Sequence, residues 1–321
     1  MRLKAVTLSI VLAATTYLVI VLWAGRADVF AAIGRVGVST LSAILGLSLA
    51  NYILRFLRWH YYLRKLGYAL PITSDLLIYI GGFALTTTPG KAGELARTLW
   101  LRPYGVVPSR SIAAFVAERL QDFLAISLLS CLGLFLYPGG RWLLLAALGV
   151  LGLAFGLLYL PEGTRAVTRW SEKSRLGAFV NQMTEIIAHT RGCLAPVPLL
   201  AGLVVGIVAW AAESWGFALV LQALGHPLSL PTALSIYAIS MLTGAVSFLP
   251  GGLGGSEAAM IVLLRVVEVP LGIAVSGTLL IRLATLWFAV LLGIIALSIR
   301  ARRPSMGADS VTPSVVTEAA Q

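Results

Sequence analysis

The sequence is poor in charged residues, cysteine and histidine. Asp, Glu, Lys and Arg make up 12% of the 321 residues, about half of their usual share in a soluble domain. Cys131 lies late in an apolar run and Cys193 beside a basic loop, so we expect them at different depths and without a disulfide. His60, His189 and His226 are scattered and lack metal-ligand spacing. We therefore expect no cofactor and no bound metal.

The motifs of soluble enzymes are also missing. The glycine-rich stretch 251–255 lacks the Lys-Ser/Thr pair that completes a phosphate-binding loop, and no nucleophile elbow or zinc motif occurs. The segments expected on the outer face hold almost no Asp or Glu, which argues against a glycosyltransferase or phosphatase acting there on polyprenyl phosphates. The sequence thus predicts a protein that is not an enzyme.

Apolar residues dominate instead. Hydrophobic residues make up 59% of the chain, the mean hydropathy is +0.92 and the net charge is +11. A water-soluble core cannot absorb so much apolar surface, whereas a bilayer can. The positive charges stand between apolar runs, where they act as topology signals and contact anionic lipid headgroups. The expected partners are therefore membrane lipids and not nucleic acid.

Six apolar segments are long enough to cross a bilayer as helices, since a span needs roughly 20 residues. They are 5–24, 38–57, 112–136, 142–160, 194–221 and 271–299. The first resembles a signal peptide, but its apolar run is too long for one. We expect it to be retained as a first helix.

Basic residues orient these segments, because Lys and Arg in short loops favour the cytoplasmic side. They stand after the second span, before the third, in the loop 161–193 and after the last span: Arg55, Arg58, Arg64, Lys65, Arg102, Arg110, Arg165, Arg169, Lys173, Arg175, Arg191, Arg300, Arg302 and Arg303. The pattern predicts a multi-pass protein of the inner membrane with both termini in the cytoplasm. We expect one transmembrane domain, 1–303, followed by a disordered tail, 304–321.

Two further apolar segments, 74–102 and 230–266, are interrupted by Pro and Gly. Basic flanks on both sides of the first favour a re-entrant helical hairpin from the cytoplasm over a single kinked span. Its first arm, 74–88, is too short for a core of about 30 Å, and a second half-helix is expected to start near Lys91. The second segment would be a hairpin from the outer side, although 230–249 alone is long enough to span.

The two halves of the chain resemble each other in sequence. Leu66-Gly67 recurs as Leu224-Gly225, Pro89-Gly90 as Pro250-Gly251, and Arg119-Leu120 as Arg282-Leu283, in the same order and at a nearly constant offset. We predict an all-α membrane protein with an inverted repeat, about 38–137 and 194–300, in which broken helices line a substrate site near the midplane. The alternative is a similar membrane composition in both halves without a structural repeat.

Each Pro-Gly break opens the N-terminus of a half-helix, whose free N–H groups and positive dipole end suit an anion such as a lipid phosphate. The candidate binding residues at the breaks are Pro89, Gly90, Gly93, Glu94, Arg97, Pro250, Gly251, Gly252, Gly254 and Glu257. The alternative is that Pro and Gly only permit tight packing and a sharp turn. Glu94 and Glu257 would compensate the helix dipoles themselves, as caps or as coupling groups.

The third span carries Glu118, Arg119 and Asp122 in its inner half. Each charge at a helix centre costs roughly 2.5–3.5 kcal/mol on insertion scales, so these side chains are not expected to face lipid. The other charges expected to be buried are Lys91, Arg97, Glu213 and Arg282. The group is either a structural ion-pair network or a headgroup site or proton path. Arg55 and Arg58, with the aromatic residues after them, are interpreted as interface anchors.

Four motifs combine in a recognisable way: Arg58-Trp59, Pro89-Gly90-x-x-Gly93-Glu94-x-x-Arg97, Glu118-Arg119-x-x-Asp122, and Pro250-Gly251-Gly252-x-Gly254 with Glu257. Over roughly residues 5–300 the chain resembles the flippase-like transmembrane domain of lysylphosphatidylglycerol synthases and its stand-alone relatives. The resemblance implies a role in moving aminoacylated phosphatidylglycerol between leaflets, or a role in hopanoid or lipid-linked sugar contexts. The soluble aminoacyl-transferase domain has no counterpart here, so lysyl transfer is not an expected activity.

The sequence therefore favours a lipid translocase for a phospholipid, an isoprenoid or hopanoid, or another lipid. One alternative is a membrane-embedded enzyme that uses Glu118 and Asp122 on a lipid-linked substrate. Another is a non-catalytic partner of a lipid-biosynthesis enzyme. The sequence does not identify the lipid, the direction of transport, the energy source or the oligomeric state.

Overall fold

The protein is helical in all the parts of the chain that the computed structural model describes, which are residues 26–133, 140–159, 177–247 and 249–302. The α-helices are α2 (Arg26–Lys65), α3 (Ile72–Phe83), α4 (Arg97–Leu101), α5 (Pro108–Ser130), α6 (Gly140–Tyr159), α8 (Gly177–Cys193), α9 (Pro196–Ala223), α10 (Leu230–Val246), α11 (Gly255–Val266), α12 (Leu271–Arg282) and α13 (Phe288–Arg302). No strand occurs within those ranges. The predicted all-α class is confirmed.

Three of the described helical segments are long and apolar enough to cross a membrane: Gly34–Lys65, Pro196–Ala223 and Leu271–Arg302. Gly34–Lys65 contains the predicted span 38–57, Leu271–Arg302 contains 271–299, and Pro196–Ala223 covers the predicted span 194–221 from residue 196 on. The helices α5 and α6 lie on the predicted spans 112–136 and 142–160. The predicted first span, 5–24, and the tail, 304–321, lie outside the described residues.

The second span was predicted to end too early. Helix α2 continues without interruption from residue 57 to Lys65, so Arg55 and Arg58 lie inside it and not in a loop after it. Both side chains are buried, because carboxylates on α5 face them. Arg64 and Lys65 are exposed at the end of the helix, and they keep their predicted place as flanking charges.

The chain follows the same order of elements twice. Both α2–α5 and α9–α13 begin with a long helix and a short helix, followed by a break at Pro-Gly. A second short element and a further long helical segment then complete each half. The turn after α2 and the turn after α9 also agree, with Gly67 at φ 92° and Gly225 at φ 83°. Such positive φ angles favour glycine, which explains why Leu-Gly occurs at both places.

The two breaks differ in detail. After Phe83 the chain forms a tight turn and then a 3₁₀ helix, η1 (Pro89–Ala96), which continues into the single turn of α4. A second helical segment therefore starts near Lys91, as predicted, but its first eight residues form a 3₁₀ helix and only Arg97–Leu101 are α-helical. In the second hairpin a short 3₁₀ turn, η4 (Pro250–Gly252), precedes a three-turn α-helix, α11.

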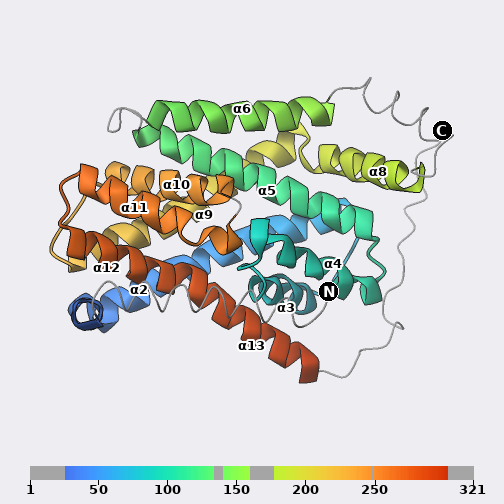
Figure 1. The fold of residues 1–321 in the computed structure, drawn as a ribbon. Helices are drawn as coiled ribbons and strands as arrows, with labels where there is room; N and C mark the ends of the chain where they lie inside the picture. Colours follow the sequence, from blue (N-terminus) through green and yellow to red (C-terminus); the bar gives the residue numbers. More distant parts are fainter. Residues whose placement is uncertain (1–25, 134–139, 160–176, 248, 303–321) are drawn as a thin grey trace.

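The two broken segments approach each other from opposite ends of the molecule. In Figure 1, α10 and α11 lie on the left and α3 and α4 on the right, while α2, α5 and the α12–α13 pair extend across both parts. The breaks meet in the middle, where η1 contacts η4. Gly251 packs closely there, since a Cβ on it would lie 3.3 Å from the Cα of Thr87.

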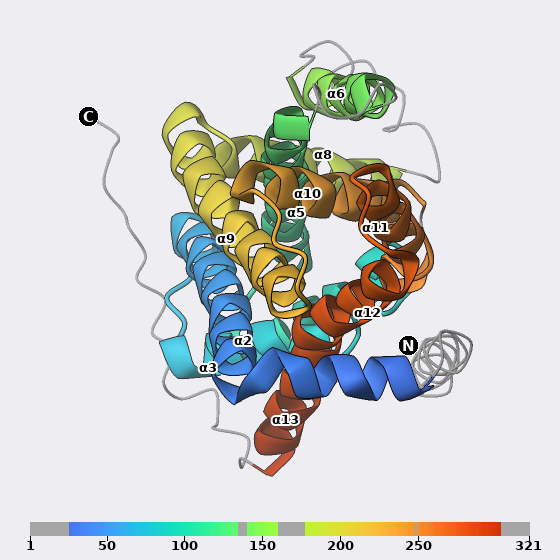
Figure 2. The same cartoon turned by 90° about the vertical axis from the view of Figure 1, so that its left-hand side faces the viewer.

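The long helices enclose this meeting point. Helices α2 and α9 pack along each other, and both views place them side by side, with α6 at the periphery (Figure 2). Helix α5 contacts α2, α9, α10 and α8, which makes it the central helix. Charged side chains on α5 are therefore surrounded by protein on several sides.

Candidate functional site

Seven charged side chains from α2, η1, α4 and α5 form one buried ion-pair network. Its members are Arg55, Arg58, Glu94, Arg97, Glu118, Arg119 and Asp122. All are buried except Arg119, whose side chain is 22% exposed. The network holds four guanidinium groups and three carboxylates. In a low-dielectric interior such charges persist only when they are paired and hydrogen-bonded.

Asp122 and Glu118 are the acceptors at the centre of this network. Asp122 binds Arg58, which donates a hydrogen bond to it, and Arg55 at 3.0 Å. Glu118 lies 3.0 Å from Arg119 and 3.5 Å from Arg55, and it accepts a hydrogen bond of 2.6 Å from Tyr79. The two carboxylates are four residues apart and share one face of α5, as their spacing predicted.

Glu94 extends the network to the first Pro-Gly break. It accepts hydrogen bonds from Thr86 and Arg97. Arg97 also lies 3.3 Å from Glu118 and stacks over the ring of Tyr79, with 4.4 Å between the guanidinium carbon and the ring centroid. The carboxylate of Glu94 is thus a fixed part of the network.

Gly93 lets η1 pack this closely. A Cβ at this position would lie 2.6 Å from the backbone oxygen of Leu85 and 2.7 Å from Oγ1 of Thr88. Only glycine fits such an approach. The side chains of Pro89 and Lys91 are outside the described residues, as is the environment of Gly90, so their predicted roles at the break remain predictions.

The interpretation of Arg55 and Arg58 as interface anchors is wrong. Both arginines point into the protein and are paired with Asp122. Trp59 and Tyr62 are buried as well. The sequence did contain a signal for this arrangement. Arg55 and Arg58 are three residues apart, and Glu118 and Asp122 are four residues apart. Each pair therefore lies on one face of its helix, and the two pairs carry opposite charges.

A second group of charges lies at the second Pro-Gly break. Arg282 donates a hydrogen bond of 2.6 Å to Glu257 and another of 3.1 Å to the carbonyl of Gly251. The other carboxylate oxygen of Glu257 accepts the N–H of Gly254 at 2.7 Å. Glu257 therefore caps the start of α11 itself, so this geometry favours the capping alternative over a phosphate on that N–H.

The two groups correspond to each other in the sequence repeat. Arg119 and Arg282 occupy matching positions after their breaks, as do Glu94 and Glu257. Tyr79 donates to Glu118, and its counterpart Tyr237 donates to Glu213 at 2.8 Å. Tyr237, Glu213 and Arg282 are all buried. The predicted burial of Arg97, Glu213 and Arg282 is confirmed.

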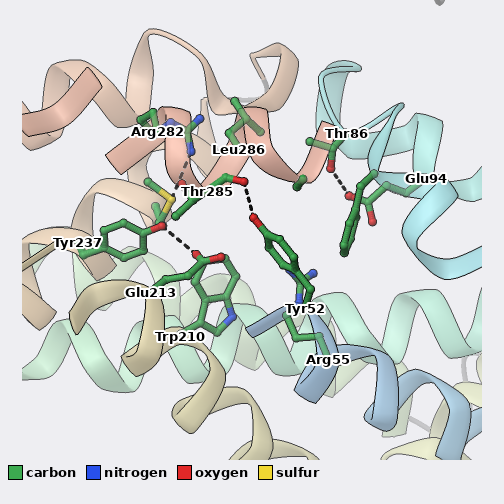
Figure 3. A pocket seen from close by; sticks show the side chains of 13 residues that line it. Tyr52, Arg55, Thr86, Glu94, Trp210, Glu213, Tyr237, Arg282, Thr285 and Leu286 are labelled. Atoms are coloured by element: carbon green, nitrogen blue, oxygen red, sulfur yellow. Dashed lines mark hydrogen bonds between the residues drawn. The ribbon is translucent and has the colours of Figure 1, made fainter. Parts of the chain in front are cut away.

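A small cavity of about 50 Å³ lies between the two groups. Figure 3 shows Thr86 pointing toward Glu94 and Tyr237 toward Glu213 on opposite sides of it, with Tyr52 directed at the backbone of Thr285. Arg55 and Arg282 also line the cavity. Charged and hydroxyl-bearing side chains line part of it, and it is large enough for water.

A larger cavity of about 250 Å³ adjoins the first, and the two share Trp210, Met241, Arg282 and Leu286. The larger one lies between α5, the second break and α12. Its other lining residues are Arg119, Asp122, Phe123, Ile126, Gly244, Ala245, Leu249, Gly251, Gly252 and Ser256. Some of the predicted site residues line these two cavities, namely Glu94, Arg119, Asp122, Gly251, Gly252 and Arg282. Gly93, Arg97, Glu118, Gly254 and Glu257 are not among the lining residues.

The described part of the chain was also compared with the requirements of a metal site. No three Asp, Glu, His or Cys side chains gather there as ligands. Cys131 and Cys193 are not disulfide-bonded, as predicted.

Comparison with known proteins gives a consistent result. Residues 6–293 match the family described as the lysylphosphatidylglycerol synthase TM region. A UPF0104 membrane protein of Methanothermobacter thermautotrophicus is 25% identical over 66% of this chain and 70% of its own length. A UPF0104 membrane protein of Methanocaldococcus jannaschii is 24% identical over 75% of this chain and 79% of its own. A third, from Pyrococcus horikoshii, is 22% identical over 89% and 94%.

Proposed function

We propose that this chain, which belongs to the family of the lysylphosphatidylglycerol synthase transmembrane region, moves a lipid from one leaflet of a membrane to the other. It is a multi-pass membrane protein with several apolar helices. The observation that carries the proposal is the buried charged network beside an amphiphilic cavity, at the point where the two broken segments meet. A lipid that crosses the bilayer needs a polar path for its headgroup at that depth.

Burial of so many charges has a high energetic cost. Four arginines and five carboxylates near the two cavities are buried, and a fifth arginine, Arg119, is partly buried; the buried ones are Arg55, Arg58, Arg97, Arg282, Glu94, Glu118, Asp122, Glu213 and Glu257. A simple helical bundle would be no less stable with apolar residues at many of these positions. Intramembrane charges that lie against a cavity are typical of substrate or ion pathways.

We infer that the two halves form an inverted repeat with two re-entrant hairpins. The same order of elements in α2–α5 and α9–α13, and the approach of the breaks from opposite ends, support this topology. The exposed basic residues Arg64, Lys65 and Arg102 stand at one end of the molecule with α4. That placement favours cytoplasmic termini in an inner membrane, with 1–303 as one transmembrane domain.

We propose no enzymatic activity for the chain. A general base must be able to take up a proton, but Glu118 and Asp122 are each held by several guanidinium groups. Those cations stabilise the ionised form and weaken the base. Partnership with a lipid-biosynthesis enzyme is a second proposal, which is compatible with translocation.

The test is lipid redistribution in proteoliposomes that contain the purified full chain. Wild type is compared with Glu94→Gln and Glu118→Gln, and with Glu185→Gln as a matched control, since Glu185 is exposed on α8. We expect wild type and the control to move at least one lipid class across the bilayer and the two network variants to move it at least tenfold more slowly. If no lipid moves under any imposed ion gradient, the proposal fails.

A further inference from the structure

The two cavities are lined by corresponding positions of the two halves of the chain. The side-chain amide of Asn51 on α2 donates a hydrogen bond of 2.8 Å to the carbonyl of Ala209 on α9, which stands 158 positions later. Tyr79 and Tyr237 are separated by the same offset. At this offset, three residues that line the small cavity have counterparts in the wall of the larger one: Tyr52, Phe83 and Thr86 correspond to Trp210, Met241 and Gly244.

Helix α5 and the segment from α12 to α13 give the same correspondence. Their residues match at the offset that relates Arg119 to Arg282. The small cavity is lined by Arg282, Thr285, Leu286 and Ala289, and the larger one by Arg119, Asp122, Phe123 and Ile126. The two cavities are therefore the same space, formed once by each half of the repeat.

The two spaces differ in size and in access. The small cavity has about 50 Å³, and all its lining residues except Met241 are buried. The larger cavity has about 250 Å³ and reaches the exposed residues Ala245 and Leu249 on the α10 side. The counterpart of Ala245 is Thr87, which is fully buried, and Gly251 of the second break lies against it. The structure thus holds this space open in the second half and closed in the first.

A hydrogen bond between two lining residues closes the small cavity. The hydroxyl of Tyr52 on α2 donates to the backbone carbonyl of Thr285, as Figure 3 shows. The counterparts of these residues are Trp210 and Asp122, which both line the larger cavity. Nε1 of Trp210 is buried and donates to no acceptor in the described part of the chain. The closing bond is therefore present in the closed cavity and absent from the open one.

Two buried polar groups lack a partner as a result. Trp210 is only 7% exposed, and a buried donor without an acceptor is costly. The hydroxyl of Thr87 is also buried and makes no hydrogen bond with the described residues. If the two halves exchanged conformations, the indole N–H would reach the carboxylate of Asp122, and Thr87 would face an open cavity as Ala245 does now. Both groups therefore point to a second state.

We propose that the two cavities open in turn. In the state described here the larger cavity is open beside α10, and the bond between Tyr52 and Thr285 closes its counterpart. In the second state that bond is broken, Trp210 donates to Asp122, and the small cavity opens beside α3. This inference rests on the proposed translocation and its inverted repeat, and it states how the two sides of one passage open alternately.

Two single cysteines at corresponding positions report the two states. Ile126 and Ala289 are 5% and 6% exposed, but Ile126 lines only the larger cavity and Ala289 only the small one. Ile126→Cys and Ala289→Cys are placed in the full chain without Cys131 and Cys193 and reconstituted in vesicles. The rate of reaction with a small, water-soluble methanethiosulfonate is measured. We expect Ile126→Cys to react at least tenfold faster than Ala289→Cys, and equal rates would overturn the assignment of the open side.

Two further substitutions should shift the states in opposite directions. Tyr52→Phe removes the closing bond of the described state, so Ala289→Cys should react about threefold to tenfold faster. Trp210→Phe removes the donor that stabilises the second state, so Ala289→Cys should react more slowly. Neither change should make Ile126→Cys react faster. The matched control is Tyr159→Phe, which removes a bond of 3.1 Å to the carbonyl of Leu194 away from both cavities and should change neither rate.

The opposite signs separate exchange from a general loss of structure. Loosened or unfolded protein would make both cysteines react faster, and that result with either variant would overturn the proposal. A shift of Ala289→Cys in the same direction by Tyr52→Phe and Trp210→Phe would overturn it as well, as would no shift by Tyr52→Phe.

Lipid redistribution in the same vesicles distinguishes this inference from the proposed function. Opposite shifts of the reaction rate without any lipid movement would leave the exchange of cavities in place and remove the translocase function. Lipid movement at the wild-type rate in Tyr52→Phe, with neither cysteine affected, would remove the exchange and leave the function.

Discussion

The guanidinium of Arg55 lies 3.0 Å from the carboxylate of Asp122, which joins α2 directly to α5. Neither side chain is more than 6% exposed. Arg58 approaches the same carboxylate from one turn further along α2. Asp122 thus ties α2 to α5, the central helix, beside the cavity that Gly251 and Gly252 of the second break also line.

This relationship predicts a large effect of Asp122→Asn. The neutral side chain would leave Arg55 and Arg58 without their main counter-ion, and loss of one partner of a buried pair costs about 3–5 kcal/mol. We expect a clear drop in Tm, measured in detergent by thermal unfolding of the full chain. Glu185→Gln on the exposed face of α8 is the control and should leave Tm unchanged. An Asp122→Asn protein as stable as the control would show that the network contributes little to stability.

Gly93 leads to a prediction about the first break. In Gly93→Ala the added methyl group would meet the backbone oxygen of Leu85 at 2.6 Å, and backbone cannot move aside as a flexible side chain does. Overpacking of this kind costs about 1–3 kcal/mol. The matched control is Gly192→Ala, since nothing lies within 4 Å of a Cβ at that helical position. Thermal unfolding should show a lower Tm for Gly93→Ala only, and equal Tm values would contradict the close packing.

The breaks could be located from the sequence, but their internal shape could not. Pro89-Gly90 and Pro250-Gly251 are recognisable in the sequence, because Pro and Gly are helix breakers and both pairs interrupt long apolar runs. The 3₁₀ helix η1 packs with Gly93 directly against the backbone oxygen of Leu85. That contact is tertiary and leaves no local pattern.

For Arg55 and Arg58, the sequence led to the wrong environment. A charge near the end of an apolar run is most simply interpreted as the end of the span. The cost of burying these two arginines is offset by Asp122 and Glu118, which lie sixty or more positions later in the sequence. The carboxylates themselves were identified correctly as buried, because they stand in the middle of a span and have no other way to avoid lipid.

Asp75 gives a prediction outside the central network. Its carboxylate accepts a hydrogen bond of 3.1 Å from Trp59 and lies 2.6 Å from Nδ1 of His60, and it is fully buried. It therefore fastens the start of α3 to the end of α2. Asp75→Leu should destabilise the protein by about 1–3 kcal/mol, because the indole N–H loses its acceptor.

Asp75→Asn is the variant to compare with Asp75→Leu, since its amide oxygen can still accept the hydrogen bond from Trp59. We expect a loss of Tm smaller than that of Asp75→Leu. Equal losses would mean that the contact with His60, and not the bond from Trp59, holds the two helices together.

The proposed topology predicts which loops share a side of the membrane. Four exposed positions can each carry a single cysteine in a background without Cys131 and Cys193: Ala69, Pro103, Pro227 and Leu271. If both broken segments are re-entrant, Ala69→Cys and Pro103→Cys react from one side, and Pro227→Cys and Leu271→Cys from the other. The measurement is labelling by a membrane-impermeant maleimide in right-side-out and inverted vesicles.

Each pair of cysteines is its own control, because the two members flank one broken segment. A kinked spanning helix in place of the first hairpin would put Ala69→Cys and Pro103→Cys on opposite sides. The same outcome for Pro227→Cys and Leu271→Cys would make 230–266 a span. Two spans in place of two hairpins would remove the inverted arrangement, since the Pro-Gly breaks would then no longer enter from opposite sides toward the shared cavities.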